Sequence, residues 1–180
     1  MNTMFYGCTK LATLDISNFN TSKVNNIQSM FYECNSLTEL NLSGFNTELI
    51  TNMYGLFYNC NKLTSLDLSR FNTSNVNNMN SMFYECKSLK ELNISSFDTA
   101  NVENMNAMFQ GCSALQKLDL SHFNTSKVTS MSYMFHNCNM LSELDVSSFE
   151  TQQVTTMHNM FYGCKLLKTL NVSNFVTNNV

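Results

Sequence analysis

Apolar residues recur along this chain with a fixed period of 26 residues. The second copy runs from Met30 to Phe45 and reduces to M-F-x-x-C-x-x-L-x-x-L-x-L-S-x-F. A fixed period between 20 and 50 residues is typical of stacked repeats, because one unit cannot bury its apolar face alone. The pattern therefore predicts a solenoid of about seven coils. The cysteines mark its register at Cys8, Cys34, Cys60, Cys86, Cys112, Cys138 and Cys164.

Each repeat contains one short segment with the periodicity of a strand. Leu14 and Ile16 alternate with polar residues, and Leu11 precedes them to complete an L-x-x-L-x-L pattern. Such alternation indicates a strand with one buried face. Because nearly a whole coil separates one strand from the next, we expect the strands to pair in parallel.

A second segment, near residues 22–33 of each repeat, predicts a short helix. Val24, Ile27, Met30, Phe31 and Cys34 are spaced by three, three, one and three residues, which describes one helical face. The threonine at position 21 precedes the segment and can cap its first turn. The expected fold class is therefore α/β: a leucine-rich-repeat-like solenoid in which each coil is a short parallel strand plus a short helix. An all-β solenoid is the alternative.

The domain organisation is expected to be one repeat array over residues 1–180. Met1 and Val180 both occupy core positions of the repeat, whereas solenoids normally close their ends with atypical capping repeats. We therefore expect a segment of a longer array without its caps.

Composition and residue placement argue against several functions. The net charge is −3 and only 13% of residues are charged, so the basic surface that binds nucleic acid is missing. No apolar run approaches the ~18 residues that span a membrane. The cysteines form one column, which we interpret as buried free thiols rather than disulfides or metal ligands. The histidines occupy three different repeat positions. We therefore expect no catalytic residue, no metal and no cofactor.

The repeated phrase resembles the BspA-like leucine-rich repeats of bacterial surface proteins, in their 26-residue subgroup. The F-x-x-C-x-x-L-x-x-L-x-L and S-x-F-N-T-S-K-V-x-x-M portions carry the resemblance, which covers essentially the whole chain. It implies a secreted or cell-surface protein linked to adhesion, without catalytic residues.

Candidate binding residues lie at repeat positions whose residue type varies from one repeat to the next. The outward positions of each strand carry carboxylates and amides that nearly alternate between two columns, and we interpret them either as a solvated face or as an acidic strip for a basic or glycan partner. These candidates are Glu39, Asn41, Asp67, Glu91, Asn93, Asp119, Glu143 and Asp145. Arg70 and His122, after their strands, are candidates for the rim. A column of tyrosines is a third candidate, which more simply covers the adjacent core.

These observations together predict a non-catalytic module that binds a protein or glycan on a host or neighbouring cell. The alternative is a structural spacer or stalk with no ligand of its own.

Overall fold

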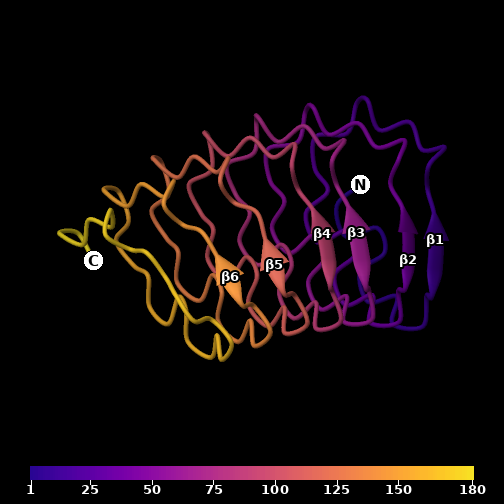
Figure 1. The fold of residues 1–180 in the computed structure, drawn as a ribbon. Coiled ribbons are helices and arrows are strands. Elements are labelled where there is room, and N and C mark those ends of the chain that lie inside the picture. Colours follow the sequence, from indigo (N-terminus) through magenta and orange to yellow (C-terminus); the bar gives the residue numbers. More distant parts are fainter.

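The computed structural model describes all residues, 1–180, as one row of coils running from the N-terminus to the C-terminus (Figure 1). Six short strands lie on the same side of the row, one in each of the first six coils (Figure 1). They are β1 (Thr13–Asp15), β2 (Glu39–Asn41), β3 (Ser65–Asp67), β4 (Glu91–Asn93), β5 (Lys117–Leu118) and β6 (Glu143–Leu144). The predicted repeat solenoid is confirmed.

Strand pairing is parallel, as the sequence predicts, but it is interrupted. Regular ladders join β1 to β2, β3 to β4 and β5 to β6. The leucines face one another in register, for example Leu14 opposite Leu40. A second line of contacts links the coils elsewhere, through single parallel bridges such as those from Asn52 to Asn78 and from Asn78 to Asn104.

The predicted helix near residues 22–33 is wrong: this segment forms turns in every coil. The amides of Met30, Cys34 and Leu37 donate to the carbonyl oxygens three residues earlier, at Ile27, Phe31 and Cys34. The three-residue spacing of apolar side chains thus reflects successive β-turns rather than a helical face. With turns in place of helices, the all-β alternative describes the fold better than the α/β class.

Hydrogen bonds between coils explain why turns replace the helix. Alternate amides donate to the next coil: Ser29 to Tyr54, Phe31 to Leu56 and Glu33 to Tyr58, at 2.8–3.1 Å. In a helix, each of these donors would instead bond within its own segment. The successive turns of residues 27–37 and their equivalents in the other coils, which we call the turn ribbon, therefore join neighbouring coils. The remaining amides of the turn ribbon close the turns themselves.

Two positions in each turn ribbon require a left-handed backbone. The first is occupied by Ser29 in one coil and Gly55 in the next, with φ of 52° and 57°. At the second, Glu33 has a φ of 60° and Gly111 a φ of 75°. Glycine adopts this conformation without steric cost, which explains why glycines recur in a segment that otherwise resembles a helix.

The threonine column does not cap helices either, so that prediction is also wrong. Thr73 is fully buried, and its hydroxyl donates to the carbonyl of Asp98 and accepts from the amide of the same residue, both at 2.8 Å. Each threonine thus joins its own coil to the next through its hydroxyl group. The column comprises Thr21, Thr47, Thr73, Thr99, Thr125 and Thr151.

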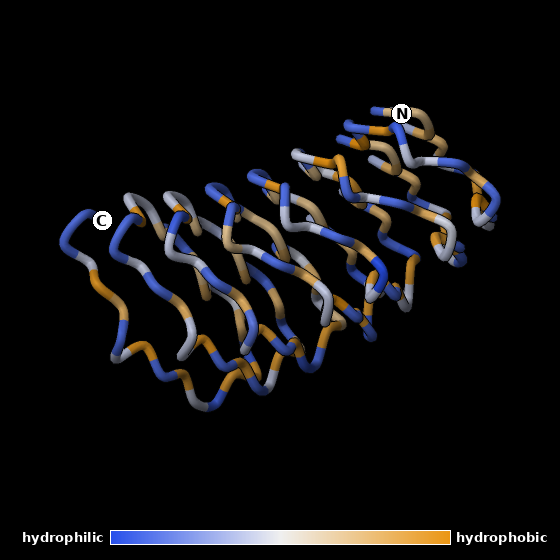
Figure 2. The backbone as a smooth tube through the Cα atoms, turned by 90° about the horizontal axis from the view of Figure 1, so that it is seen from above, coloured by the Kyte–Doolittle hydropathy of each residue, from blue (hydrophilic) through white to orange (hydrophobic).

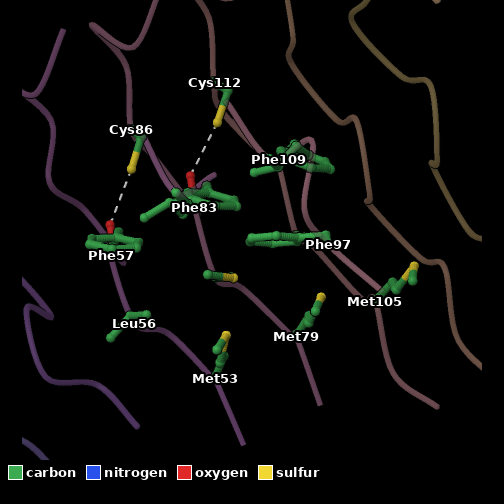
Figure 3. Packing of buried hydrophobic residues seen from close by; sticks show 14 of the residues in the cluster. Met53, Leu56, Phe57, Met79, Phe83, Cys86, Phe97, Met105, Phe109 and Cys112 are labelled. Carbon is green, nitrogen blue, oxygen red and sulfur yellow. Dashed lines mark hydrogen bonds between the residues drawn. The ribbon is translucent and has the colours of Figure 1, made fainter. Parts of the chain in front are cut away.

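The core is one continuous cluster of 45 buried residues along the row of coils, and apolar segments recur in each coil (Figure 2). Phenylalanine rings stack nearly parallel to one another through it: Phe57, Phe83 and Phe109 have centroid separations of 5.7 and 5.5 Å (Figure 3). Because every coil packs its columns on the next, the core grows by addition of coils rather than around one centre.

Candidate functional site

All predicted binding residues on the strands are exposed on one surface, which we call the strand face. It consists of the outward positions of the strands, on either side of the inward leucines. The eight candidates from Glu39 to Asp145 lie on it, and all eight are exposed.

Two open hollows lie along the strand face. The first, of about 630 Å³, is centred on β2 and brings together Asp15, Glu39, Asn41 and Asp67 around Leu40. It is lined by residues of three successive coils. The partly exposed Leu40 provides an apolar patch amid these polar groups.

The second hollow, of about 520 Å³, repeats this arrangement two coils further on. It is centred on β4, where Glu91, Leu92 and Asn93 occupy the places of Glu39, Leu40 and Asn41. Asp67 and Ser65 line both hollows, so the two are continuous along the strand face. Asp119, Glu143 and Asp145 lie outside both hollows.

The charges of the two hollows differ. Asp15, Glu39 and Asp67 line the first, and no cationic side chain does. In the second, Lys90 and Lys117 accompany Asp67 and Glu91. Further along, the ammonium of Lys117 lies 3.2 Å from the carboxylate of Glu143, and this exposed ion pair offsets the acidic character there.

The second column of the strand face also has a structural role. The Oδ1 atom of Asp67 accepts a hydrogen bond from the amide of Ser69 at 3.0 Å, and Asn41 accepts similarly from Ser43 at 3.1 Å. This turn-closing bond lowers the pKa of the Asp67 carboxyl, because it stabilises the ionised form. The Oδ1 atoms of Asp67 and Asn41 are therefore committed to the fold, while both side chains still line the first hollow. The same bond, accepted by Oδ1 from the amide two residues later, recurs at Asp15, Asn93, Asp119, Asp145 and Asn171.

A two-coil period underlies these hollows, and the sequence reasoning missed it. A phenylalanine follows each strand after a few residues, beginning with Phe19 and Phe45. The position before it alternates between small and larger residues: Asn18, Gly44, Arg70, Ser96, His122, Ser148 and Asn174. Each paired set of strands ends with a coil that carries glycine or serine at this position. Glu39, Glu91 and Glu143 fall in those same coils. A comparison of alternate repeats would have shown the 52-residue unit.

The two rim candidates have different surroundings. His122 donates from Nε2 to the carbonyl oxygen of Ile94 at 3.1 Å, whereas Ser96 reaches the equivalent oxygen of Leu68 with its short hydroxyl. Both side chains thus join the end of their own strand to the preceding coil, and no regular ladder pairs β4 with β5. Arg70 remains exposed beside Gly44 and Glu48, where it lines a separate hollow of about 510 Å³.

The tyrosine column forms a stacked ladder away from the strands. Tyr32 lies 4.7 Å from Tyr6 and 4.0 Å from Tyr58, measured between ring centroids. Burial raises the pKa of Tyr58 to about 12. With their faces occupied by one another, these central rings cover the turn ribbon and present mainly their edges to solvent. This arrangement favours the covering role over a ligand platform.

Two of the three histidines lie around one tyrosine. His136 and His158 both pack edge-on against Tyr133, with centroid separations of 5.6 and 5.3 Å. No group of three or more His, Cys, Asp or Glu side chains lies close enough to hold a metal ion.

The cysteine column is a ladder of free thiols, as the sequence suggests. Cys60 donates from Sγ to the carbonyl oxygen of Phe31, and Cys112 to that of Phe83, at 3.2 Å each (Figure 3 shows the second). Burial raises the pKa of Cys34 to about 11 and that of Cys86 to about 12. These thiols therefore stay protonated at neutral pH and are poor nucleophiles.

Comparison with known proteins places the chain in a family and a fold. A family model described as "Mycoplasma protein of unknown function, DUF285" matches residues 1–117 and again residues 89–180. No curated protein matches the sequence. No helix in the structure is long and apolar enough to cross a bilayer.

Solved structures of bacterial leucine-rich-repeat proteins are similar to this chain, and two of them, with TM-scores above 0.5, share its fold. The T. pallidum leucine-rich-repeat protein is 19% identical, with a TM-score of 0.54 over 93% of this chain and 70% of its own. A protein from Eubacterium ventriosum is 18% identical, with a TM-score of 0.51 over 97% of this chain and 36% of its own. A leucine-rich cell surface protein from Faecalibacterium prausnitzii is 21% identical, with a TM-score of 0.45 over 64% of this chain and 27% of its own. The chain thus spans between about a quarter and about a third of the length of the last two of these proteins.

Proposed function

The chain belongs to the DUF285 family, whose description assigns no activity. From the geometry of the strand face, we propose that it is a non-catalytic binding module. The observation that carries this proposal is the recurrence of one hollow at an interval of two coils. Glu39, Leu40 and Asn41 line the first hollow, and the identical triplet from Glu91 lines the second.

The spacing of the hollows fits an extended ligand. Adjacent parallel strands lie about 4.8 Å apart, so two coils span on the order of 10 Å. A linear glycan or an extended peptide can place equivalent groups in both hollows at this spacing. A compact small molecule would occupy one hollow and leave the other without a role.

The chemistry of the face favours a ligand rich in hydrogen-bond donors. The polar groups of the first hollow are carboxylates, an amide and hydroxyls, and they surround the leucines of three successive coils. Carboxylates accept hydrogen bonds from sugar hydroxyls and from basic side chains. The partner we propose is a protein or glycan on a host or neighbouring cell, and we place this protein at the cell surface or outside the cell, within the BspA-like group that its repeats resemble.

Binding of arrayed glycans and peptides tests this proposal. A triple variant, Glu39→Gln, Asp67→Asn and Glu91→Gln, removes three charges, and the amide introduced by Asp67→Asn retains an Oδ1 acceptor for the turn. The control is Asp98→Asn, Glu103→Gln and Glu150→Gln, which removes the same charges outside the strand face; Asp98 holds an equivalent turn with the amide of Ala100.

The strand-face variant should lose at least about tenfold in affinity, since hydrogen bonds to charged groups contribute roughly 1.5–3 kcal/mol each. The control should bind like the wild type. Equal binding by both variants would exclude the strand face as the site. No binding by the wild type to any glycan or peptide would favour the spacer alternative.

A further inference from the structure

The rim candidate Arg70 lies in a hollow of its own, apart from the two hollows of the strand face. This rim hollow, of about 510 Å³, is lined by eight residues of the second and third coils, just after β2 and β3. Arg70 is the only arginine of the chain, and the other nine basic residues are lysines. Its guanidinium takes part in neither ion pair of the structure and donates no hydrogen bond to the protein. All of its N–H donors are therefore free for a ligand.

The position of Arg70 in the repeat serves the fold in later coils. Ser96 and Ser148 donate from their hydroxyls to carbonyl oxygens of the preceding coil, at 3.1 and 3.2 Å. Nε2 of His122 lies 3.1 Å from the equivalent carbonyl oxygen of Ile94. Arg70 makes no such bond, so its charged group does not contribute to joining the coils.

The two asparagines of the rim hollow, Asn46 and Asn72, have fixed orientations. Oδ1 of Asn46 accepts from the amide of Glu48 at 2.9 Å, and Oδ1 of Asn72 accepts from the amide of Ser74 at 3.0 Å. These bonds commit each oxygen to its own turn and leave both Nδ2 groups without a protein acceptor. The hydroxyl of Ser43, which also lines the hollow, has no protein partner either. The rim hollow thus combines one cation with several free hydrogen-bond donors.

Glu48 limits which anions fit the rim hollow. Its carboxylate is exposed and belongs to neither ion pair of the structure. It repels compact dianions such as phosphate, but it can accept hydrogen bonds from hydroxyl groups. The hollow therefore suits a singly charged anion that also carries hydroxyls.

We propose that the rim hollow binds the carboxylate of an acidic sugar. The planar fork of Arg70 can hold both carboxylate oxygens through parallel hydrogen bonds, which the single ammonium group of a lysine cannot do. The free amide groups then donate to oxygens of the sugar, and Glu48 accepts from its hydroxyls. This site is separate from the strand face and adds to the function proposed there.

Titration of the chain with three small probes, followed by ligand-observed NMR, tests the proposal. Glucuronate has a carboxylate and ring hydroxyls, glucose has only the hydroxyls, and acetate has only the carboxylate. Arg70→Gln removes the charge, whereas Arg70→Lys keeps the charge without the fork. The matched control is Lys62→Gln, because Lys62 is an exposed cation of the same coil outside the hollow. Circular dichroism checks that each variant keeps the wild-type fold.

Glucuronate should bind the wild type at least about tenfold more tightly than glucose or acetate, since only glucuronate engages both Arg70 and Glu48. Both Arg70 variants should lose at least about tenfold in affinity for glucuronate, and Lys62→Gln should match the wild type. The triple strand-face variant should still bind glucuronate, so failure of the strand-face proposal would leave this result unchanged.

Three outcomes would overturn the proposal. One is a wild type that does not bind glucuronate. Another is equal affinity for acetate, which would indicate a site for any carboxylate, including the C-terminus of a peptide. The third is binding by the Arg70 variants that equals that of the control.

Discussion

The thiol of Cys86 donates a hydrogen bond to the carbonyl oxygen of Phe57 in the preceding coil, across 3.1 Å (Figure 3). The same carbonyl closes a turn by accepting from the amide of Cys60, also at 3.1 Å. The most regular residue of the sequence therefore joins two coils through a side chain that never reaches solvent.

Replacing this thiol should destabilise the solenoid. Cys86→Ala removes a buried sulfur and its hydrogen bond, and we expect the free energy of unfolding to fall by about 1–2 kcal/mol. Cys8→Ala is the control, because Cys8 is only partly buried and has no carbonyl partner; it should cost under about 0.5 kcal/mol. Urea denaturation measures both, and equal losses would contradict the proposed role of the bond.

The alkaline side of the stability profile should depend on the same thiol. Burial raises the pKa of Cys86 from 9.0 to about 12, so the folded chain retains a proton that the unfolded chain releases. This contribution is complete below pH 9 and is lost as the pH rises towards 12. The stability difference between wild type and Cys86→Ala should therefore shrink over that range. A difference that stays constant would show that Cys86 has an ordinary pKa in the folded state.

The hydrogen bonds of the threonine column predict a loss of stability on substitution that the burial of apolar surface alone does not predict. Thr73→Val keeps the shape of the side chain but leaves the partly buried amide and carbonyl of Asp98 without their partner. We expect a loss of about 1–3 kcal/mol in the free energy of unfolding. Thr177→Val changes the same residue type where it is exposed and unbonded, so it should stay within about 0.5 kcal/mol of the wild type. If Thr73→Val were neutral, the hydrogen bonds of the threonine column would not contribute to stability.

The left-handed positions of the turn ribbon predict a stabilising substitution. Glu33 has a φ of 60°, a conformation that costs an L-residue roughly 1–2 kcal/mol. Glu33→Gly should raise the free energy of unfolding by about 0.5–1 kcal/mol, after the greater chain entropy of glycine is deducted. Glu39→Gly, which places glycine in β2, should lower it by a similar amount. Thermal melting of the two variants distinguishes these signs, and a destabilised Glu33→Gly would refute the turn assignment.

The 26-residue period was sufficient to predict the solenoid, the parallel strands and the inward columns. It did not distinguish helix from turns, because Val24, Ile27 and Met30 have the spacing that both structures produce. Gly55 and Gly111 within the supposed helix were the discriminating signal, since they mark positions where the backbone is left-handed. The bonds that decide the outcome join different coils, and a local pattern does not contain them.

The candidate site was predictable only in part. Alternation along the strands identified Glu39 and Asn41 as exposed, and both line a hollow. The sequence reasoning did not reveal that the side chain of Asn41 also closes a turn, or that Lys117 pairs with Glu143. Both interactions depend on how the backbone bends after the strand and on the distance between neighbouring coils.

The central claim is that a ligand occupies the two hollows together, and Ser65 offers the most direct test because it lines both. The indole of Ser65→Trp should fill the space where the two hollows meet. Asn77→Trp adds the same ring at an exposed position outside the hollows. The measurement is the affinity of both variants for whichever arrayed glycan or peptide the wild type binds. We predict that Ser65→Trp abolishes binding and that Asn77→Trp preserves it. Wild-type affinity in Ser65→Trp would contradict the claim.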